Sequence, residues 1–140
     1  MKILVTGVKG QLGFDVVNEL EQRGHTAIGV DIEEMDITNK ESVNTVIHGA
    51  NPDGVIHCAA WTAVDAAEEE ENKEKVMAVN ASGTRYIAEV CKDLAIPMMY
   101  ISTDYIFDGQ GETPWTPDQQ NYAPLNVYGC LLYTSPSPRD

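Results

Sequence analysis

The feature that most constrains the fold is a short apolar segment that runs directly into three evenly spaced glycines. Residues 3–5 are apolar, and Gly7, Gly10 and Gly13 follow with the spacing G-x-x-G-x-x-G. A strand, a glycine-rich turn and the start of a helix form the arrangement that binds the pyrophosphate of a dinucleotide. Glycines allow a tight turn, close approach of phosphate to the backbone, and close packing of helix on strand. The segment therefore predicts a dinucleotide site.

The hydrophobic pattern beyond the glycines alternates between helical and strand periodicity. In chain order the predicted elements are a strand at 2–6, a helix from Gln11 to near Gly24, a strand at 26–30, a helix opened by the capping box Thr38-Asn39-Lys40-Glu41, a strand at 55–60, a long helix reaching Leu94 and a strand at 98–101. Repeated alternation of this kind predicts an α/β fold, a Rossmann-type doubly wound parallel sheet.

Asp31 closes the second predicted strand, about 20 residues beyond the glycine turn. Folds of this type place a carboxylate there to accept hydrogen bonds from the adenosine ribose, and the alternative is a solvated loop aspartate. The same carboxylate repels a 2′-phosphate, so NADH is favoured over NADPH as cofactor. Asp36 and Ile37 follow in a segment that either contacts the adenine or is only a loop.

Composition excludes several classes of partner. The 140 residues carry a formal net charge of -13, which argues against nucleic acid or an anionic membrane surface. The sequence has no apolar run of transmembrane length and no signal peptide, so a cytoplasmic location is expected. Three cysteines without a C-x-x-C pair fit a reducing compartment, and Cys58 and Cys91 are expected in the core. The three histidines share no metal-ligand spacing, and no metal site is expected.

The second half of the chain places polar groups in three different settings. The acidic run Glu68–Glu71 is interpreted as solvated helix surface without catalytic duty. Asn80 lies on an otherwise apolar helix face, where a buried amide often fixes a neighbouring loop. Hydroxyl and carboxylate side chains follow the last predicted strand at 102–109, where ligands bind in open α/β sheets. A turn-rich loop at 110–126 then leads to a helix start that carries Tyr128.

Five sequence blocks in a fixed order resemble those of the extended short-chain dehydrogenase/reductase superfamily, and within it most closely the dTDP-4-dehydrorhamnose reductases. They are T-G-x-x-G-x-x-G at 6–13, A-A-W-T-A-V-D-x-A-E at 59–68, V-N-A-x-G-T at 79–84, S-T-D-Y-I-F-D-G at 102–109 and P-L-N-V-Y-G at 124–129. The resemblance covers residues 1–129. It implies reduction by NAD(P)H of the C4 keto group of dTDP-4-dehydro-L-rhamnose, a small-molecule nucleotide sugar, to dTDP-L-rhamnose.

The resemblance also implies roles for individual residues. Tyr128 is the acid that protonates the C4 alkoxide, and Thr103 hydrogen-bonds the carbonyl oxygen. Asp104 and Tyr105 lie near the sugar together with Thr103. The residues implied to surround the dinucleotide are Gly7, Gly10, Gln11, Leu12, Gly13, Asp31, Asp36, Ile37, Ala59, Ala60 and Thr62.

The chain departs from the superfamily pattern after Gly129. The motif Y-x-x-x-K requires lysine four residues beyond Tyr128, and this chain has Leu132. The superfamily pattern predicts a helix at this point, but the sequence of residues 130–140 is not amphipathic and does not favour one. These residues are similar to the translation of a sequencing adapter. They are therefore expected to be a non-native tail on an incomplete Rossmann domain, 1–129, that lacks its last strands and the substrate lobe. Such a chain is expected to be inactive by itself.

Two other functions remain open beside the reductase. One is a different extended-superfamily enzyme, a sugar-nucleotide epimerase or dehydratase. The other is a non-catalytic relative such as the regulatory subunit of methionine adenosyltransferase, which keeps the fold and binds a protein. The sequence leaves open whether the full-length protein is a homodimer, and whether it depends on Mg²⁺.

Overall fold

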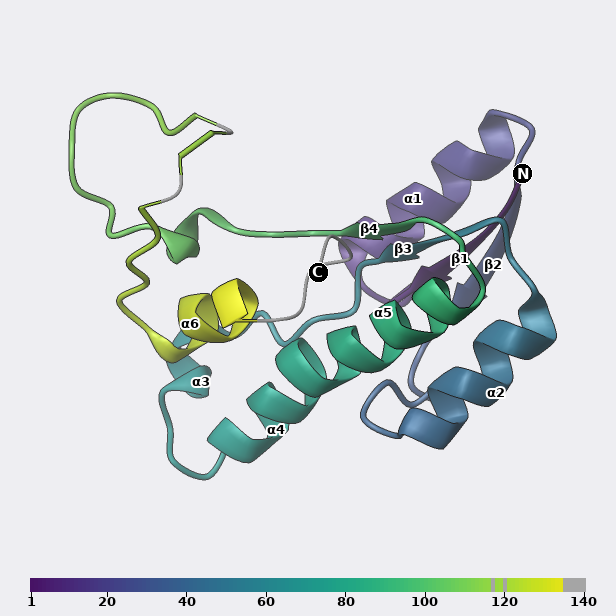
Figure 1. Cartoon of the computed structure of the whole chain (residues 1–140), viewed down its shortest axis with the longest axis horizontal. Coiled ribbons are helices and arrows are strands. Elements are labelled where there is room, and N and C mark those ends of the chain that lie inside the picture. The colour runs from purple at the N-terminus through teal and green to yellow at the C-terminus, as the bar shows by residue number, and fades with distance from the viewer. Residues whose placement is uncertain (117, 120, 135–140) are drawn as a thin grey trace.

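Strands and helices alternate along most of the chain in a computed structural model that describes residues 1–116, 118–119 and 121–134 (Figure 1). The strands are β1 (Lys2–Thr6), β2 (Thr26–Val30), β3 (Gly54–His57) and β4 (Met98–Tyr100). The α-helices are α1 (Gln11–Gln22), α2 (Lys40–Ala50), α3 (Val64–Ala67), α4 (Lys73–Met77), α5 (Thr84–Asp93) and α6 (Val127–Thr134). A π-helical segment, η1 (Ala78–Gly83), joins α4 to α5, and a 3-10 turn, η2 (Asp104–Ile106), follows β4.

The four strands form one parallel sheet in the order β2-β1-β3-β4. The central strand β1 pairs with β2 on one side, where Leu4 lies beside Ile28, and with β3 on the other, where Leu4 lies beside Val55. The chain therefore passes from β1 to β2 at one edge of the sheet, and from β3 to β4 at the other edge. In sheets of this kind the ligand site lies at the carboxyl ends of the two strands where the order reverses. The predicted α/β parallel sheet is confirmed.

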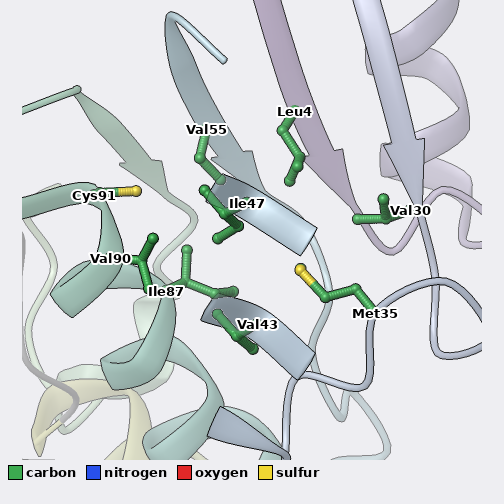
Figure 2. Packing of buried hydrophobic residues seen from close by; sticks show 9 residues of the cluster. All are labelled: Leu4, Val30, Met35, Val43, Ile47, Val55, Ile87, Val90 and Cys91. Atoms are coloured by element: carbon green, nitrogen blue, oxygen red, sulfur yellow. The ribbon is translucent and has the colours of Figure 1, made fainter. Parts of the chain in front are cut away.

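Helices cover both faces of the sheet, with α1 on one side and α2 and α5 on the other (Figure 1). Figure 2 shows the core between the sheet and helices α2 and α5. Strand residues Leu4 and Val55 meet Ile47 from α2 and Ile87 from α5, and all four are at most 2% exposed. Cys91 of α5 lies in the same cluster, as expected for a small apolar residue. Burial raises the pKa of this thiol to about 11, so it stays protonated at neutral pH.

Three predicted boundaries are wrong by one to three residues. The N-cap of α2 is Asn39, whose side-chain oxygen accepts hydrogen bonds from the N–H groups of Glu41 and Ser42, while the Thr38 hydroxyl donates to Asp36. Strand β4 ends at Tyr100, one residue early. Strand β3 ends at His57 because the next two backbone N–H groups donate to the Thr6 hydroxyl and leave the sheet ladder.

The long helix predicted up to Leu94 contains one wide turn that periodicity did not indicate. The π-helical turn Ala78–Gly83 places Asn80 inward, where it is 2% exposed. The Asn80 amide makes two hydrogen bonds to the backbone of Trp61. Its Oδ1 accepts from the Trp61 N–H at 2.8 Å, and its Nδ2 donates to the Trp61 carbonyl at 3.0 Å. The predicted role of Asn80 in fixing a neighbouring loop is confirmed.

Replacing Asn80 with alanine is expected to lower the free energy of unfolding by about 2 kcal/mol, because the buried backbone groups of Trp61 lose their partner. Urea denaturation followed by circular dichroism measures this change. Asn44→Ala on the exposed face of α2 is the matched control and should change the unfolding free energy by less than about 0.5 kcal/mol. Equal effects of the two substitutions would contradict the role of Asn80.

The expectation that residues beyond Gly129 do not form a helix is wrong as far as Thr134, where α6 ends. The first turn of α6 is capped by the Asn126 side chain, which accepts from the Gly129 N–H at 2.7 Å. Leu131 and Leu132 are good helix formers, and both are at most 9% exposed. Capping and burial together stabilise this short helix although its sequence is not amphipathic.

Candidate functional site

A cavity of about 850 Å³ opens at the carboxyl ends of β1 and β3, where the strand order reverses. A volume of this size is typical of sites for cofactors and other small molecules. The predicted dinucleotide residues all line this cavity: Gly7, Gly10, Gln11, Leu12, Gly13, Asp31, Asp36, Ile37, Ala59, Ala60 and Thr62. Tyr128 and Leu132 line it as well, although they lie far from the glycine turn in the sequence.

Two glycines of the turn are required by close contacts. Gly7 has φ = 71°, and a Cβ there would lie 2.8 Å from the backbone of Ala59. A Cβ on Gly13 would overlap the carbonyl group of Gly7. The turn can therefore fold against both the end of β3 and the start of α1 only when these positions have no side chain.

The N-terminus of α1 has the chemistry of an anion site. Its N-cap is Gly10, and no described side chain caps the first turn. The first N–H groups of a helix lack intrahelical partners and carry the positive end of the helix dipole. Since Gly10, Gln11 and Leu12 also line the cavity, the pyrophosphate of a dinucleotide fits this end of it.

Asp31 is held with its carboxylate toward the glycine turn. One oxygen accepts from the Lys9 N–H and the other from the Ile32 N–H, both at 2.9 Å. Each ionised carboxylate oxygen has a second lone pair, so the group can still accept hydrogen bonds from a diol. The Lys9 ammonium lies 2.8 Å from Glu33, and among the described residues that line the cavity it is the only lysine or arginine side chain. This end of the cavity is therefore suited to neutral hydroxyl groups.

A buried hydrogen-bond chain lies beneath the cavity floor. The Thr6 hydroxyl oxygen accepts from the N–H groups of Cys58 and Ala59, each at 3.1 Å, and lies 2.7 Å from His57 Nδ1. A hydroxyl has one hydrogen and two lone pairs, so Thr6 donates to Nδ1. The imidazole proton must then sit on Nε2, which donates to Thr84 Oγ1 at 3.1 Å, and that hydroxyl donates to the Asn80 carbonyl.

His57 is consequently neutral. It is 2% exposed, and burial lowers its pKa from 6.5 to about 4. Protonation would place a hydrogen on Nδ1, which accepts from the Thr6 hydroxyl and would lose that hydrogen bond. The hydrogen bonds fix the Nε2–H tautomer and hold the backbone at Cys58 and Ala59, which line the cavity.

Tyr128 also lines the cavity, from the first turn of α6. Burial raises its pKa above the ordinary value of 10, and Tyr105 and Asp104 raise it further. The Tyr105 ring packs edge-on against the Tyr128 ring, with centroids 5.9 Å apart. Leu132, where the superfamily has lysine, is 6% exposed and supplies no charge that would lower this pKa.

The predicted sugar-contacting residues lie near this part of the cavity. Asp104 and Tyr105 line a second cavity of about 280 Å³, next to Leu125 and Asn126 of the following loop. Thr103 lines neither cavity. Its hydroxyl donates to the Asp104 carboxylate at 3.2 Å and accepts from the Tyr105 N–H at 3.3 Å, capping η2. The structure thus brings the three residues together, with the Thr103 hydroxyl already engaged.

Several cavity residues were not among the site residues predicted from the sequence. Lys9, Met35, Val79 and Ser102 come from four separate segments that only the folded chain brings to one wall. Within residues 1–116, 118–119 and 121–134, no three His, Cys, Asp or Glu side chains gather as a metal site. None of the helices in that part of the chain is long and apolar enough to cross a bilayer.

Comparison with known proteins gives a consistent picture. The chain is 39% identical over 127 residues to a dTDP-4-dehydrorhamnose reductase of Streptomyces griseus, which spans 91% of this chain and 41% of that protein. A dTDP-4-dehydrorhamnose reductase of Shigella flexneri is 36% identical over 133 residues, with 92% and 43% covered. The chain therefore spans less than half the length of these curated relatives.

Solved structures show the same relationship. A dTDP-4-dehydrorhamnose reductase of Clostridium acetobutylicum superposes with a TM-score of 0.88 at 36% identity, covering 95% of this chain and 46% of that one. The Bacillus anthracis enzyme, crystallised with NADP, gives 0.83 at 35% identity, covering 94% and 46%. The family model described as RmlD substrate binding domain matches residues 1–134. The chain belongs to the RmlD substrate binding domain family.

Proposed function

We propose that this chain binds NAD(P)H and forms the cofactor-binding part of an enzyme that reduces dTDP-4-dehydro-L-rhamnose to dTDP-L-rhamnose. The observation that carries the proposal is the single cavity at the switch point, which the glycine turn, Asp31 and Tyr128 line together. Relatives that are 36–39% identical to this chain over 127–133 aligned residues are named as dTDP-4-dehydrorhamnose reductases. One related solved structure contains NADP.

Different residues of the site supply different parts of the proposed chemistry. The uncapped start of α1 binds the pyrophosphate, and Asp31 accepts hydrogen bonds from the adenosine ribose. The bound dinucleotide supplies the hydride. Tyr128 donates a proton to the C4 oxygen of the sugar, Thr103 polarises that carbonyl, and Asp104 and Tyr105 contact the sugar ring.

NADH is the cofactor that this cavity favours. Among the described residues, three carboxylates line it, those of Asp15, Asp31 and Asp36, and the single ammonium group, that of Lys9, is paired with Glu33. A 2′-phosphate beside Asp31 would meet like charge, and the described part of the cavity wall offers no unpaired lysine or arginine to offset it. The adenosine hydroxyl groups of NADH can instead donate to the Asp31 carboxylate.

Replacing Asp31 with alanine is expected to weaken NADH binding about tenfold, because one bidentate acceptor is lost. The same change removes the repulsion of the 2′-phosphate, so NADPH binding should hold steady or improve. Quenching of tryptophan fluorescence during titration with each cofactor measures both affinities. Asp93→Asn, at the far end of α5, is the control and should change neither. Failure of the unmodified chain to bind either cofactor at millimolar concentration would overturn the proposed function.

A second candidate is dinucleotide binding without turnover, as in a regulatory relative. Leu132 in place of lysine favours it, because Tyr128 then keeps a raised pKa. The prediction that residues 130–140 are non-native bears on this choice. Resequencing the source DNA across these codons decides it, since a lysine codon at position 132 restores the reductase motif and a leucine codon supports the regulatory alternative.

A further inference from the structure

The acidic run Glu68–Glu71 contains one carboxylate whose hydrogen-bond partner lies far away in the sequence, whereas Glu69 and Glu70 bond to nearby residues. Glu68 Oε1 accepts a hydrogen bond of 2.6 Å from the Val127 N–H, 59 residues away in the sequence. Val127 is the first residue of α6, directly before Tyr128. Glu68 is exposed, as the interpretation as solvated surface expects, and its hydrogen bond joins the end of α3 to the start of the helix that carries the proposed acid.

Glu68 extends from a well-anchored backbone. It follows α3, and its N–H donates to the Asp65 carbonyl at 3.2 Å. The preceding residue, Ala67, is fully buried in a cluster with Val76 and Leu131, against which Tyr128 also packs. The carboxylate is thus presented to α6 from a fixed position, and α3 lies beside α6 in Figure 1.

Tyr105 also contacts the first turn of α6. Gly129 lies so close to the Tyr105 carbonyl that a Cβ would overlap it. The Tyr105 ring contacts the Tyr128 ring edge-on at an interplanar angle of 86°. Glu68 and Tyr105 therefore both hold the first turn of α6. A rotation of that turn would move the Tyr128 ring in the cavity.

We propose that Glu68 is a positioning residue for Tyr128, which it orients by capping α6 from the end of α3. This inference rests on the proposed role of Tyr128 as proton donor. A carboxylate at a helix N-terminus also interacts favourably with the helix dipole, and a charge-assisted hydrogen bond is stronger than a neutral one. Glu68 itself touches neither the cofactor nor the sugar in this assignment.

The test compares Glu68→Ala, Glu68→Gln and Glu71→Ala in the 140-residue chain without cofactor. Glutamine keeps an oxygen that can accept from Val127, and it removes the charge. Glu71 belongs to the same run, and its side chain makes none of the hydrogen bonds or ion pairs found among the described residues. NMR measures the hydrogen exchange of the Val127 amide, the nuclear Overhauser effect between the Tyr105 and Tyr128 rings, and the Tyr128 pKa.

Glu68→Ala is expected to speed Val127 amide exchange about tenfold, weaken the Tyr105–Tyr128 ring contact and move the Tyr128 pKa down toward 10 as the ring becomes more solvated. Glu68→Gln should keep exchange within about twofold of the unmodified chain and preserve the ring contact. Glu71→Ala should change none of the three. Unchanged exchange and ring contact in Glu68→Ala would overturn the inference. These readouts need no dinucleotide, so they fail or succeed independently of cofactor binding.

Discussion

Replacing Leu132 with lysine is expected to lower the pKa of Tyr128 by about 1 to 3 units, the range for an opposite charge within 4–6 Å. In the present chain burial, Tyr105 and Asp104 all raise that pKa. Leu132 lies one helical turn beyond Tyr128, and both side chains line the same cavity. A lysine there can extend its ammonium into the cavity beside the phenol, which stabilises the tyrosinate form.

Titration of ¹³Cζ-labelled tyrosine by NMR measures this shift, and Tyr128→Phe assigns the resonance. Leu132→Met keeps the volume without adding charge, so its Tyr128 pKa should stay within about 0.3 units of that of the unmodified chain. A Tyr128 pKa that does not fall in Leu132→Lys would show that position 132 does not face the phenol. Because its Tyr128 pKa is lower, Leu132→Lys should favour proton donation by Tyr128 at neutral pH more than the unmodified chain does.

The parts of the fold that were predicted from the sequence are those fixed by local pattern. An apolar run followed by Gly7, Gly10 and Gly13 specifies a strand, a turn without room for side chains and a helix start, and the structure has each of them. Asp31 could be placed at the cavity because the carboxyl ends of parallel strands meet at one edge of the sheet. Neither prediction requires knowledge of contacts between distant segments.

The features that could not be predicted depend on such contacts. The bond from Val127 to Glu68 joins residues far apart in the sequence, and nothing in the acidic run distinguishes Glu68 from its neighbours. The π-helical turn at Ala78–Gly83 shifts helical periodicity by a single residue, which an apolar pattern tolerates. The length of β3 was overestimated because Thr6, a residue of another strand, takes the hydrogen bonds of Cys58 and Ala59.

The stability of the chain is expected to fall by about 3 kcal/mol as the pH is lowered from 6.5 to 4, because His57 must stay neutral in the folded state. Its pKa is about 4 when folded and 6.5 when exposed, and burial is the cause of the difference. Between these values the unfolded chain binds a proton that the folded chain does not. The free energy of unfolding should therefore decrease by about 1.4 kcal/mol for each pH unit lost, with no contribution from His57 above pH 6.5.

Urea denaturation at intervals from pH 7.5 to 4.5 measures this slope. His57→Gln removes the titrating group and keeps both a donor and an acceptor, so the part of the slope due to His57 should vanish, whereas His48→Gln on exposed α2 should retain it. The pKa of Glu89 is lowered by Lys40, so its contribution is lost below 4.5, outside the measured window. A slope that His57→Gln leaves intact would mean that the Thr6–His57–Thr84 chain accepts a proton without penalty. Such a result would contradict the lowered pKa of His57, which burial of the imidazole explains.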